Sequence, residues 1–181
     1  MVEKRNVVLG ITGGIAAYKA CGIVSKLKKS GVNVDVIMTE NATKFITPLT
    51  LETLSSNPVA TDMFSDKGHW EVEHVSLANK ADVLLVAPAT ANIIGKVACG
   101  IADDMLSTTI MATKAKVIFA PAMNVNMYDN PIVQENIKKL MSFGYDFIDS
   151  ETGMLACGIE AKGRLASLDV IVDYVLKKLG E

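Results

Sequence analysis

The chain has 181 residues, of which half are apolar and 21% are charged, and its formal net charge is −2. This length suits one compact domain spanning residues 1–181. The apolar excess is consistent with surface buried between subunits and also with a tightly packed monomer. The near-neutral charge and the lack of a basic tract argue against nucleic acid as a partner. No stretch approaches the roughly 18 apolar residues of a membrane span, and the N-terminus lacks the features of a signal peptide.

The three cysteines, Cys21, Cys99 and Cys157, lie far apart and have no metal-binding spacing. Their odd number argues against a disulfide framework, and no metal site is expected. Cys21 and Cys99 fall in helical patterns and are interpreted as packing residues, whereas Cys157 lies in a polar loop. These features favour a soluble, cytoplasmic protein of a reducing compartment.

Short apolar runs alternate with amphipathic segments along the chain. The run 6–12 is almost continuously apolar, which is typical of a strand buried on both faces of a parallel sheet. In 14–30 the apolar residues recur at helical spacing, and Gly31 ends that predicted helix. The same reasoning predicts strands at 32–38, 82–87, 116–120 and 145–148, helices at 42–55 with a break at Pro48, 90–113, 132–142 and 168–179, and irregular segments at 56–73 and 149–167.

This alternation predicts an α/β fold: a single doubly wound, Rossmann-like or flavodoxin-like parallel sheet with helices on both faces. Ligands of such sheets bind beyond the carboxyl ends of the strands. The candidate binding loops are therefore 12–16, 39–43, 87–93 and 120–128.

The loop after the first predicted strand contains Gly13 and Gly14. Glycines at a strand-to-helix turn let backbone N–H groups approach a phosphate. Their spacing fits neither the dinucleotide fingerprint nor the P-loop, so a nucleotide site and a simple tight turn are about equally supported. In the third loop, Thr90 and Asn92 suit the polar edge of a heterocycle, although a helix N-cap is the simpler interpretation.

Three further features are ambiguous when taken alone. Pro121-Ala122-Met123-Asn124 places an amide side chain just past the fourth predicted strand. His74, one of two histidines, suits either a structural role or proton transfer. Cys157 precedes Lys162 and Arg164, and nearby cations lower the pKa of a thiol, so Cys157 is a candidate reactive group.

Taken together, these segments resemble the homo-oligomeric, flavin-containing cysteine decarboxylases, and the resemblance runs almost end to end. Each segment is weak alone, but the ordered set is specific. Two positions depart from the family pattern: Ile93 stands where threonine is common, and Ala161 stands where glycine is usual. The matching segments are Gly-Ile-Thr-Gly-Gly-Ile-Ala-Ala-Tyr-Lys at 10–19, His74, Pro-Ala-Thr-Ala-Asn at 88–92, Pro-Ala-Met-Asn at 121–124 and Ala-Cys-Gly at 156–158.

The resemblance implies FMN as cofactor and a homo-oligomer, either a trimer or a dodecamer of four trimers, with FMN at a subunit contact. It implies that His74 takes a proton from the substrate during oxidation and that Cys157 donates one in the closing reduction. Asn124 would hold the substrate carboxylate, with Met123 beside the substrate. The implied FMN contacts are Gly13, Gly14, Ile15, Thr39, Thr90, Ala91, Asn92 and Ala122.

The implied reaction converts 4′-phosphopantothenoylcysteine to 4′-phosphopantetheine in coenzyme A biosynthesis, through thioaldehyde and enethiolate intermediates. Oxidation of the CH2–SH carbon gives a C=S group that accepts the electrons released with CO2, and a hydride is then returned. A lantibiotic-type peptidyl-cysteine decarboxylase, which stops at the enethiol, is one alternative, and Cys157 argues against it. A non-catalytic, FMN-binding regulatory flavoprotein is the other, and it would be expected to lack His74, Asn124 or Cys157. An NAD-dependent oxidoreductase is disfavoured by the glycine spacing.

Overall fold

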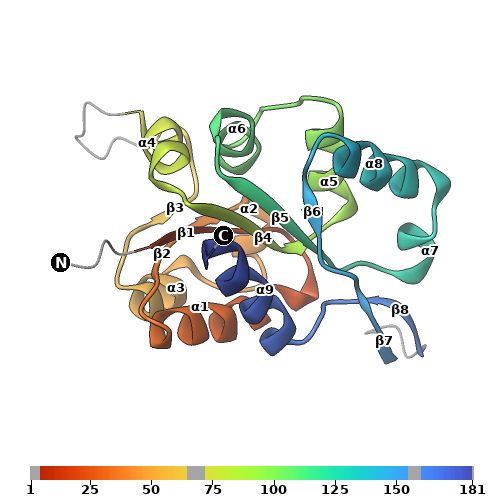
Figure 1. Cartoon of the computed structure of the whole chain (residues 1–181), viewed down its shortest axis with the longest axis horizontal. Helices are drawn as coiled ribbons and strands as arrows, with labels where there is room; N and C mark the ends of the chain where they lie inside the picture. The colour runs from red at the N-terminus through yellow and green to blue at the C-terminus, as the bar shows by residue number, and fades with distance from the viewer. Residues whose placement is uncertain (1–4, 65–71, 155–159, 181) are drawn as a thin grey trace.

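The computed structural model describes residues 5–64, 72–154 and 160–180. Within these residues, six parallel strands form one sheet in the order β3-β2-β1-β4-β5-β6 (Figure 1). This is the strand order of a doubly wound Rossmann-type sheet, so the predicted fold class is confirmed. The strands are β1 (Asn6–Ile11), β2 (Asn33–Met38), β3 (Val59–Ala60), β4 (Val83–Ala89), β5 (Lys116–Pro121) and β6 (Asp146–Phe147).

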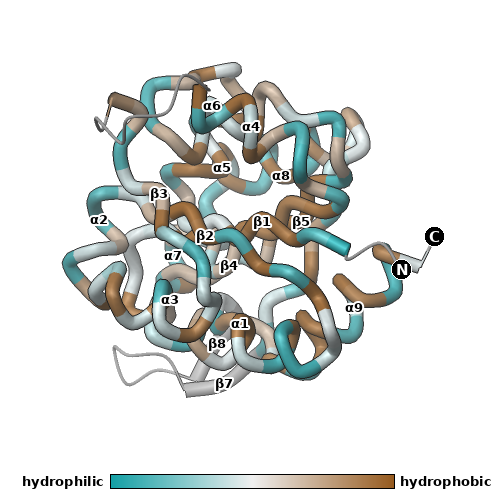
Figure 2. Tube along the Cα trace, turned by 90° about the vertical axis from the view of Figure 1, so that its left-hand side faces the viewer, coloured by the Kyte–Doolittle hydropathy of each residue, from teal (hydrophilic) through white to brown (hydrophobic). Residues whose placement is uncertain are grey.

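The sheet has a hydrophobic core on each face because successive strand side chains point to opposite sides. In β1, for example, Val7 and Leu9 join one cluster of buried residues and Val8 joins the other. Figure 2 shows the largely hydrophobic strands between two layers of helices. One layer contains η1 (Ile15–Lys19), α1 (Ala20–Lys29), α3 (Pro48–Ser55) and α9 (Leu168–Gly180), and the other contains α4 (Glu73–Lys80), α5 (Ala91–Ala98), α6 (Met105–Ala112) and α8 (Pro131–Ser142).

The strand order reverses between β1 and β4, because the chain moves outward from β1 through β2 to β3 and then returns to the other side of β1. Such a switch point separates the loops that leave the two central strands and opens a crevice at their carboxyl ends. The remaining elements border this end of the sheet: α2 (Glu40–Thr43), α7 (Val125–Tyr128) and the antiparallel hairpin of β7 (Glu151–Met154) and β8 (Glu160–Arg164).

Several predicted boundaries are wrong for identifiable physical reasons. The predicted helix 90–113 is two helices, because Asp104 and Ser107 form a reciprocal capping box that starts α6 anew. Pro48 begins α3 instead of breaking a longer helix, since the first turn needs no N–H at that position. The predicted irregular segments contain regular structure as well: 56–73 includes the edge strand β3, and 149–167 includes the β7–β8 hairpin.

Among the residues described, no helix is both long enough and apolar enough to cross a membrane. Cys21 packs partly buried against the core as expected, but Cys99 is exposed at the end of α5, so its assignment as a packing residue is wrong.

Candidate functional site

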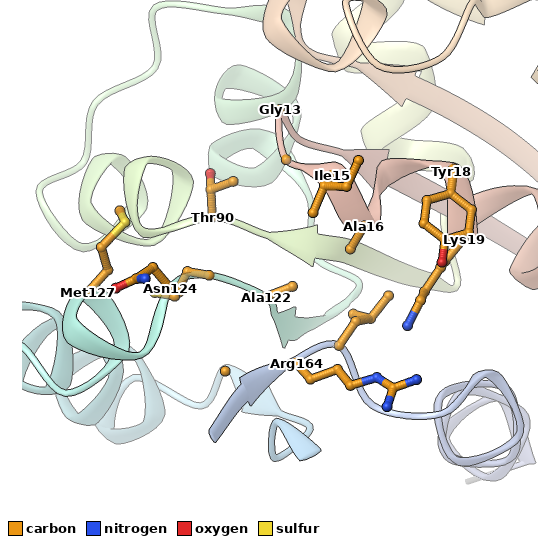
Figure 3. A pocket seen from close by; sticks show the side chains of 14 residues that line it. Gly13, Ile15, Ala16, Tyr18, Lys19, Thr90, Ala122, Asn124, Met127 and Arg164 are labelled. Atoms are coloured by element: carbon orange, nitrogen blue, oxygen red, sulfur yellow. The ribbon is translucent and has the colours of Figure 1, made fainter. Parts of the chain in front are cut away.

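A cavity of about 640 Å³ lies at the switch point, beyond the carboxyl ends of β1, β4 and β5 (Figure 3). Three of the four predicted binding loops contribute to its wall, and the β7–β8 hairpin closes one side. The wall is mainly apolar with a few polar groups, as small-molecule sites usually are. Its residues are Gly13, Gly14, Ile15, Ala16, Tyr18, Lys19, Thr90, Ala122, Met123, Asn124, Met127, Gly163, Arg164 and Leu165.

The buried hydroxyl of Thr12 joins the two sides of the switch point. Its Oγ1 donates a hydrogen bond to the carbonyl oxygen of Pro88 (2.7 Å) and accepts one from the backbone N–H of Thr90 (3.1 Å). The loops after β1 and β4 are therefore held together by one side chain beneath the cavity. The sequence motifs assign no role to Thr12, although its place between the apolar run and the glycine pair at 13–14 is visible in the sequence.

The two glycines of the first loop have different surroundings. A Cβ at Gly13 would lie 2.4 Å from Asn41 Cβ and 2.9 Å from its backbone carbon, so Gly13 permits the close approach of α2. A Cβ at Gly14 would meet only Thr90 Cγ2, at 3.8 Å, and would otherwise face open space in the cavity. Gly13 is thus required by packing, whereas Gly14 leaves room for a ligand.

The third loop serves as a helix cap and also as cavity wall. Thr90 is the N-cap of α5, and its Oγ1 accepts the N–H of Ile93 at 3.5 Å, as the simpler interpretation predicted. Thr90 also lines the cavity, but the predicted flavin contacts Ala91 and Asn92 do not. Ile93, which departs from the family pattern, is buried in the core on the α5 side of the sheet and likewise lies outside the cavity wall.

Thr39 also lies outside the cavity wall. It caps α2 by accepting the N–H of Ala42 (3.3 Å), and its own N–H bonds to the carbonyl oxygen of Ile11 (3.0 Å). The structure therefore places Thr39 next to the first loop, where it supports the packing of α2 beneath Gly13.

The Pro-Ala-Met-Asn segment forms the wall opposite the first loop (Figure 3). Ala122 and Met123 leave β5, and Asn124 caps the short helix α7 through an Oδ1 bond with the N–H of Asn126 (2.9 Å). This bond fixes the amide so that its oxygen faces the helix. The Nδ2 group of the same amide is a hydrogen-bond donor, and a carboxylate ligand accepts hydrogen bonds.

His74 is not brought to this cavity within one chain. It lies in the first turn of α4, which packs against α6 on the opposite face of the sheet from η1 and α9 (Figure 1). Its Nδ1 atom is buried and accepts no hydrogen bond from the described part of the chain. Cys157, the third predicted catalytic residue, lies outside the described residues, as does the side chain of Ala161.

The β7–β8 hairpin supplies cavity residues from the segment 149–167, which the sequence predicts to be irregular. The carbonyl oxygen of Gly163 accepts the N–H of Met123 (3.0 Å), which ties the hairpin to the Pro-Ala-Met-Asn segment. Arg164 follows at the end of β8, and Lys19 approaches from η1. Both cations line the cavity, and neither was assigned a binding role from the sequence.

A doubly wound sheet with a cavity at its switch point is the architecture of nucleotide-binding proteins. Comparison with protein families matches residues 1–180 to the family described as Flavoprotein, and the chain belongs to that family. The resemblance deduced from the sequence motifs is therefore confirmed at the family level.

Curated relatives include a coenzyme A biosynthesis bifunctional protein CoaBC of Bacillus subtilis, which is 51% identical over all 181 residues of this chain and 45% of its own length. A probable phosphopantothenoylcysteine decarboxylase of Streptococcus mutans is 42% identical over 97% of this chain and 99% of its own. The chain thus spans about half the length of the bifunctional relatives it matches but nearly all of the Streptococcus mutans protein.

Solved structures agree with this placement. A PPC decarboxylase mutant complexed with pantothenoylaminoethenethiol superposes with a TM-score of 0.90 at 28% identity, covering 99% of this chain and 100% of that one. The FMN-dependent cysteine decarboxylase SpaF superposes with a TM-score of 0.86 at 30% identity, covering 98% of each chain. The FMN binding protein AtHal3 gives 0.83 at 28% identity, over 97% of this chain and 96% of its own.

Proposed function

We propose that the chain is a cytoplasmic, FMN-dependent decarboxylase that converts 4′-phosphopantothenoylcysteine to 4′-phosphopantetheine in coenzyme A biosynthesis, and that residues 1–181 form one decarboxylase domain. The observation that carries the proposal is the position of Asn124, which lines the same cavity as the open glycine turn at Gly14. A carboxylate-binding amide and a flavin-sized space are thus adjacent at the switch point. The near full-length likeness to the Streptococcus mutans protein supports the choice of substrate.

The cavity fits FMN by shape and chemistry. The open space beside Gly14 can admit a ligand at the glycine turn, and the apolar wall suits a flat ring system. Bound FMN supplies the hydride acceptor and donor that the decarboxylation of a cysteine carboxylate requires. The cavity residues that would hold it are Gly13, Gly14, Ile15, Thr90 and Ala122.

Asn124 orients the substrate in this proposal. Its Oδ1 accepts the N–H of Asn126, which holds the amide in one orientation, and the Nδ2 end is the hydrogen-bond donor that the substrate carboxylate would contact. Met123 and, from α7, Met127 line the cavity on the same side as Asn124 (Figure 3). Holding the carboxylate at a fixed angle beside the cavity aligns the bond that breaks when CO2 leaves.

His74 acts on a neighbouring subunit's substrate in this proposal, because neither His74 nor any other residue of α4 lines the cavity of its own chain. A histidine that does not line the cavity of its own chain can reach a substrate only where a second copy brings the two together. The cavity rim also carries apolar side chains: Ile15 is 62% exposed, Tyr18 58% and Met127 48%. We therefore expect a homo-oligomer, either a trimer or a dodecamer, measurable by light scattering during gel filtration.

The decisive experiment incubates the FMN-loaded protein with 4′-phosphopantothenoylcysteine and identifies the product by mass. We expect 4′-phosphopantetheine and one CO2 per substrate. His74→Asn and Asn124→Asp should retain FMN and lose turnover. A colourless protein that cannot be reconstituted with FMN, or an FMN-loaded protein inert toward this substrate, would reject the proposal and favour the non-catalytic flavoprotein.

A peptidyl-cysteine decarboxylase of lantibiotic type remains the second candidate because of the likeness to SpaF. The two candidates differ in the final reduction, for which Cys157 is the proposed proton donor. Cys157→Ser should still release CO2 from 4′-phosphopantothenoylcysteine but accumulate the enethiol. Fully reduced product from this variant would remove Cys157 from the mechanism, and CO2 release from a C-terminal peptidyl-cysteine by the unmodified protein would favour the second candidate.

A further inference from the structure

Two cations, Lys19 and Arg164, converge on one end of the cavity from elements far apart in the sequence (Figure 3). Lys19 ends η1 and Arg164 ends β8. Both residues also line a second cavity of about 480 Å³, which continues toward the start of α9. The pair therefore stands where the two cavities meet, whereas Asn124 belongs to the first cavity alone.

Among the residues that the structure describes, no ion pair neutralises the charge of Lys19 or Arg164. Neither side chain forms a salt bridge or a hydrogen bond with any residue that the structure describes. The pKa of Lys19 is lowered by partial burial and by the nearby Arg164 guanidinium, and Glu151 partly offsets this effect. Two cations that repel each other at the mouth of a cavity create a strong local preference for an anion.

Glu151, the acidic residue that lines the second cavity, does not pair directly with either cation. Its backbone pairs with that of Arg164 across the hairpin, and its Oε1 accepts the backbone N–H of Ser167 at 2.7 Å. This carboxylate is therefore occupied in holding the hairpin to the segment before α9. Figure 3 shows the charged ends of Lys19 and Arg164 at the same end of the first cavity.

We propose that Lys19 and Arg164 form a phosphate-monoester subsite that receives the phosphate end of the substrate and selects phosphorylated over unphosphorylated pantothenoylcysteine. This proposal rests on the proposed function. A guanidinium and an ammonium together supply the forked donors and the compact charge that bind a phosphate dianion. With Asn124 at the carboxylate, an elongated substrate would be fixed at both ends of the first cavity.

The substrate phosphate is favoured over the FMN phosphate because of where the pair lies. All four residues line the first cavity, and Gly14 lies close to Thr90. Lys19 and Arg164 also line the second cavity, which includes neither Gly14 nor Thr90. A phosphate bound between the two cations would lie at the opposite end of η1 from the turn, since Gly14 precedes η1 and Lys19 ends it. The test distinguishes the substrate phosphate from the FMN phosphate by comparing each phosphorylated ligand with its unphosphorylated form.

The test measures kcat/KM of the FMN-loaded protein for 4′-phosphopantothenoylcysteine and for pantothenoylcysteine. In Lys19→Gln and Arg164→Gln we expect the preference for the phosphorylated substrate to fall about tenfold to a hundredfold, through a raised KM, because one charge-assisted bond is lost in each variant. The kcat/KM for pantothenoylcysteine should fall much less, because this substrate has no phosphate for the two cations to contact. Lys29→Gln, which alters an exposed lysine at the end of α1, is the matched control and should keep the full preference.

Binding measurements separate the other outcomes. Calorimetry should show that both variants lose affinity for 4′-phosphopantetheine but not for pantetheine, and that they bind FMN and riboflavin with unchanged affinities. A selective loss of FMN affinity would assign the pair to the cofactor and overturn the proposal, as would an equal loss for both substrates. If the unmodified protein decarboxylates neither substrate, the proposed function fails, and the subsite is still decided by the calorimetric preference for the phosphorylated ligand.

Discussion

The backbone of Gly163 lies directly against that of Met123, with the Met123 N–H bonded to the Gly163 carbonyl oxygen at 3.0 Å. Gly163 adopts a φ of +120°, and a Cβ there would lie 2.5 Å from the Met123 carbonyl oxygen. The hairpin can approach the Pro-Ala-Met-Asn segment this closely only because residue 163 has no side chain. This contact sets the position of Arg164 at the cavity and links the hairpin to the proposed carboxylate site.

Gly163→Ala should therefore displace β8 and impair both stability and turnover. The positive φ and the clash with backbone each oppose a Cβ, and together they should cost about 2–4 kcal/mol of the free energy of unfolding. Gly144→Ala is the matched control, because its φ is +88° but nothing lies within 4 Å of the added Cβ. That variant should lose only about 1–2 kcal/mol and keep its turnover. Urea denaturation and steady-state kinetics check both; equal effects of the two variants would mean that contact with Met123 is unimportant.

Gly13→Ala and Gly14→Ala should have opposite consequences. At Gly13 the new methyl group would collide with Asn41, including its backbone, so we expect a loss of about 2–3 kcal/mol in the free energy of unfolding. At Gly14 the methyl group has space, so stability should stay within about 0.5 kcal/mol of the unmodified protein. Because it occupies that space, Gly14→Ala should weaken FMN binding, measured by flavin fluorescence. Unchanged FMN affinity in stable Gly14→Ala would place the cofactor elsewhere in the cavity.

Thr12→Val should weaken the connection between the Thr12 loop and the end of β4, and the volume of the side chain stays nearly the same. The substitution leaves the Pro88 carbonyl and the Thr90 N–H without their buried partner, which costs about 1–3 kcal/mol for each group that water cannot reach. We expect lower thermal stability and weaker FMN binding. Thr12→Ser keeps the hydroxyl and removes one methyl group, so it should lose only about 1 kcal/mol and retain FMN. If the two variants behave alike, the hydroxyl does not hold the two loops together.

The parts of this fold that follow from local sequence were predicted well. The apolar runs of β1, β2, β4 and β5 gave the parallel sheet, because strands buried on both faces need continuous hydrophobicity. The two-residue strand β3 and the hairpin were missed, since their pairing depends on distant partners and their residues lack any period.

The site was predicted less completely than the sheet. Seven residues of the motif segments line the cavity, and their contacts with FMN and substrate stay predictions: Gly13, Gly14, Ile15, Thr90, Ala122, Met123 and Asn124. Thr39, Ala91 and Asn92 do not line the cavity: Thr39 caps α2, and Ala91 and Asn92 form the first turn of α5. The separation of His74 from the cavity is a property of topology, since α4 and η1 cover opposite faces of the sheet, and no local motif carries that information.

The charge of Asp104 should make the stability of the protein depend on pH. Partial burial alone would raise the pKa of this carboxyl, but hydrogen bonds from Lys96 and from Ser107 outweigh it and lower the pKa below 3.8. Because the folded-state pKa is depressed, the stabilisation is fully present above the unfolded-state pKa of about 3.9 and is lost as pH falls through the folded-state value.

Asp104→Asn should flatten this dependence. Asparagine still caps α6, so at pH 7 we expect a loss of about 1 kcal/mol from the missing charge alone, whereas Asp104→Ala should lose about 1 kcal/mol more with the cap. Between about pH 5 and pH 3 the free energy of unfolding should fall less in Asp104→Asn than in the unmodified protein, as urea titrations at each pH would show. Asp103→Asn removes the more exposed partner of the same lysine and should leave the pH dependence nearly intact. If Asp104→Asn and the unmodified protein lose stability in parallel, the acid sensitivity arises from another carboxyl.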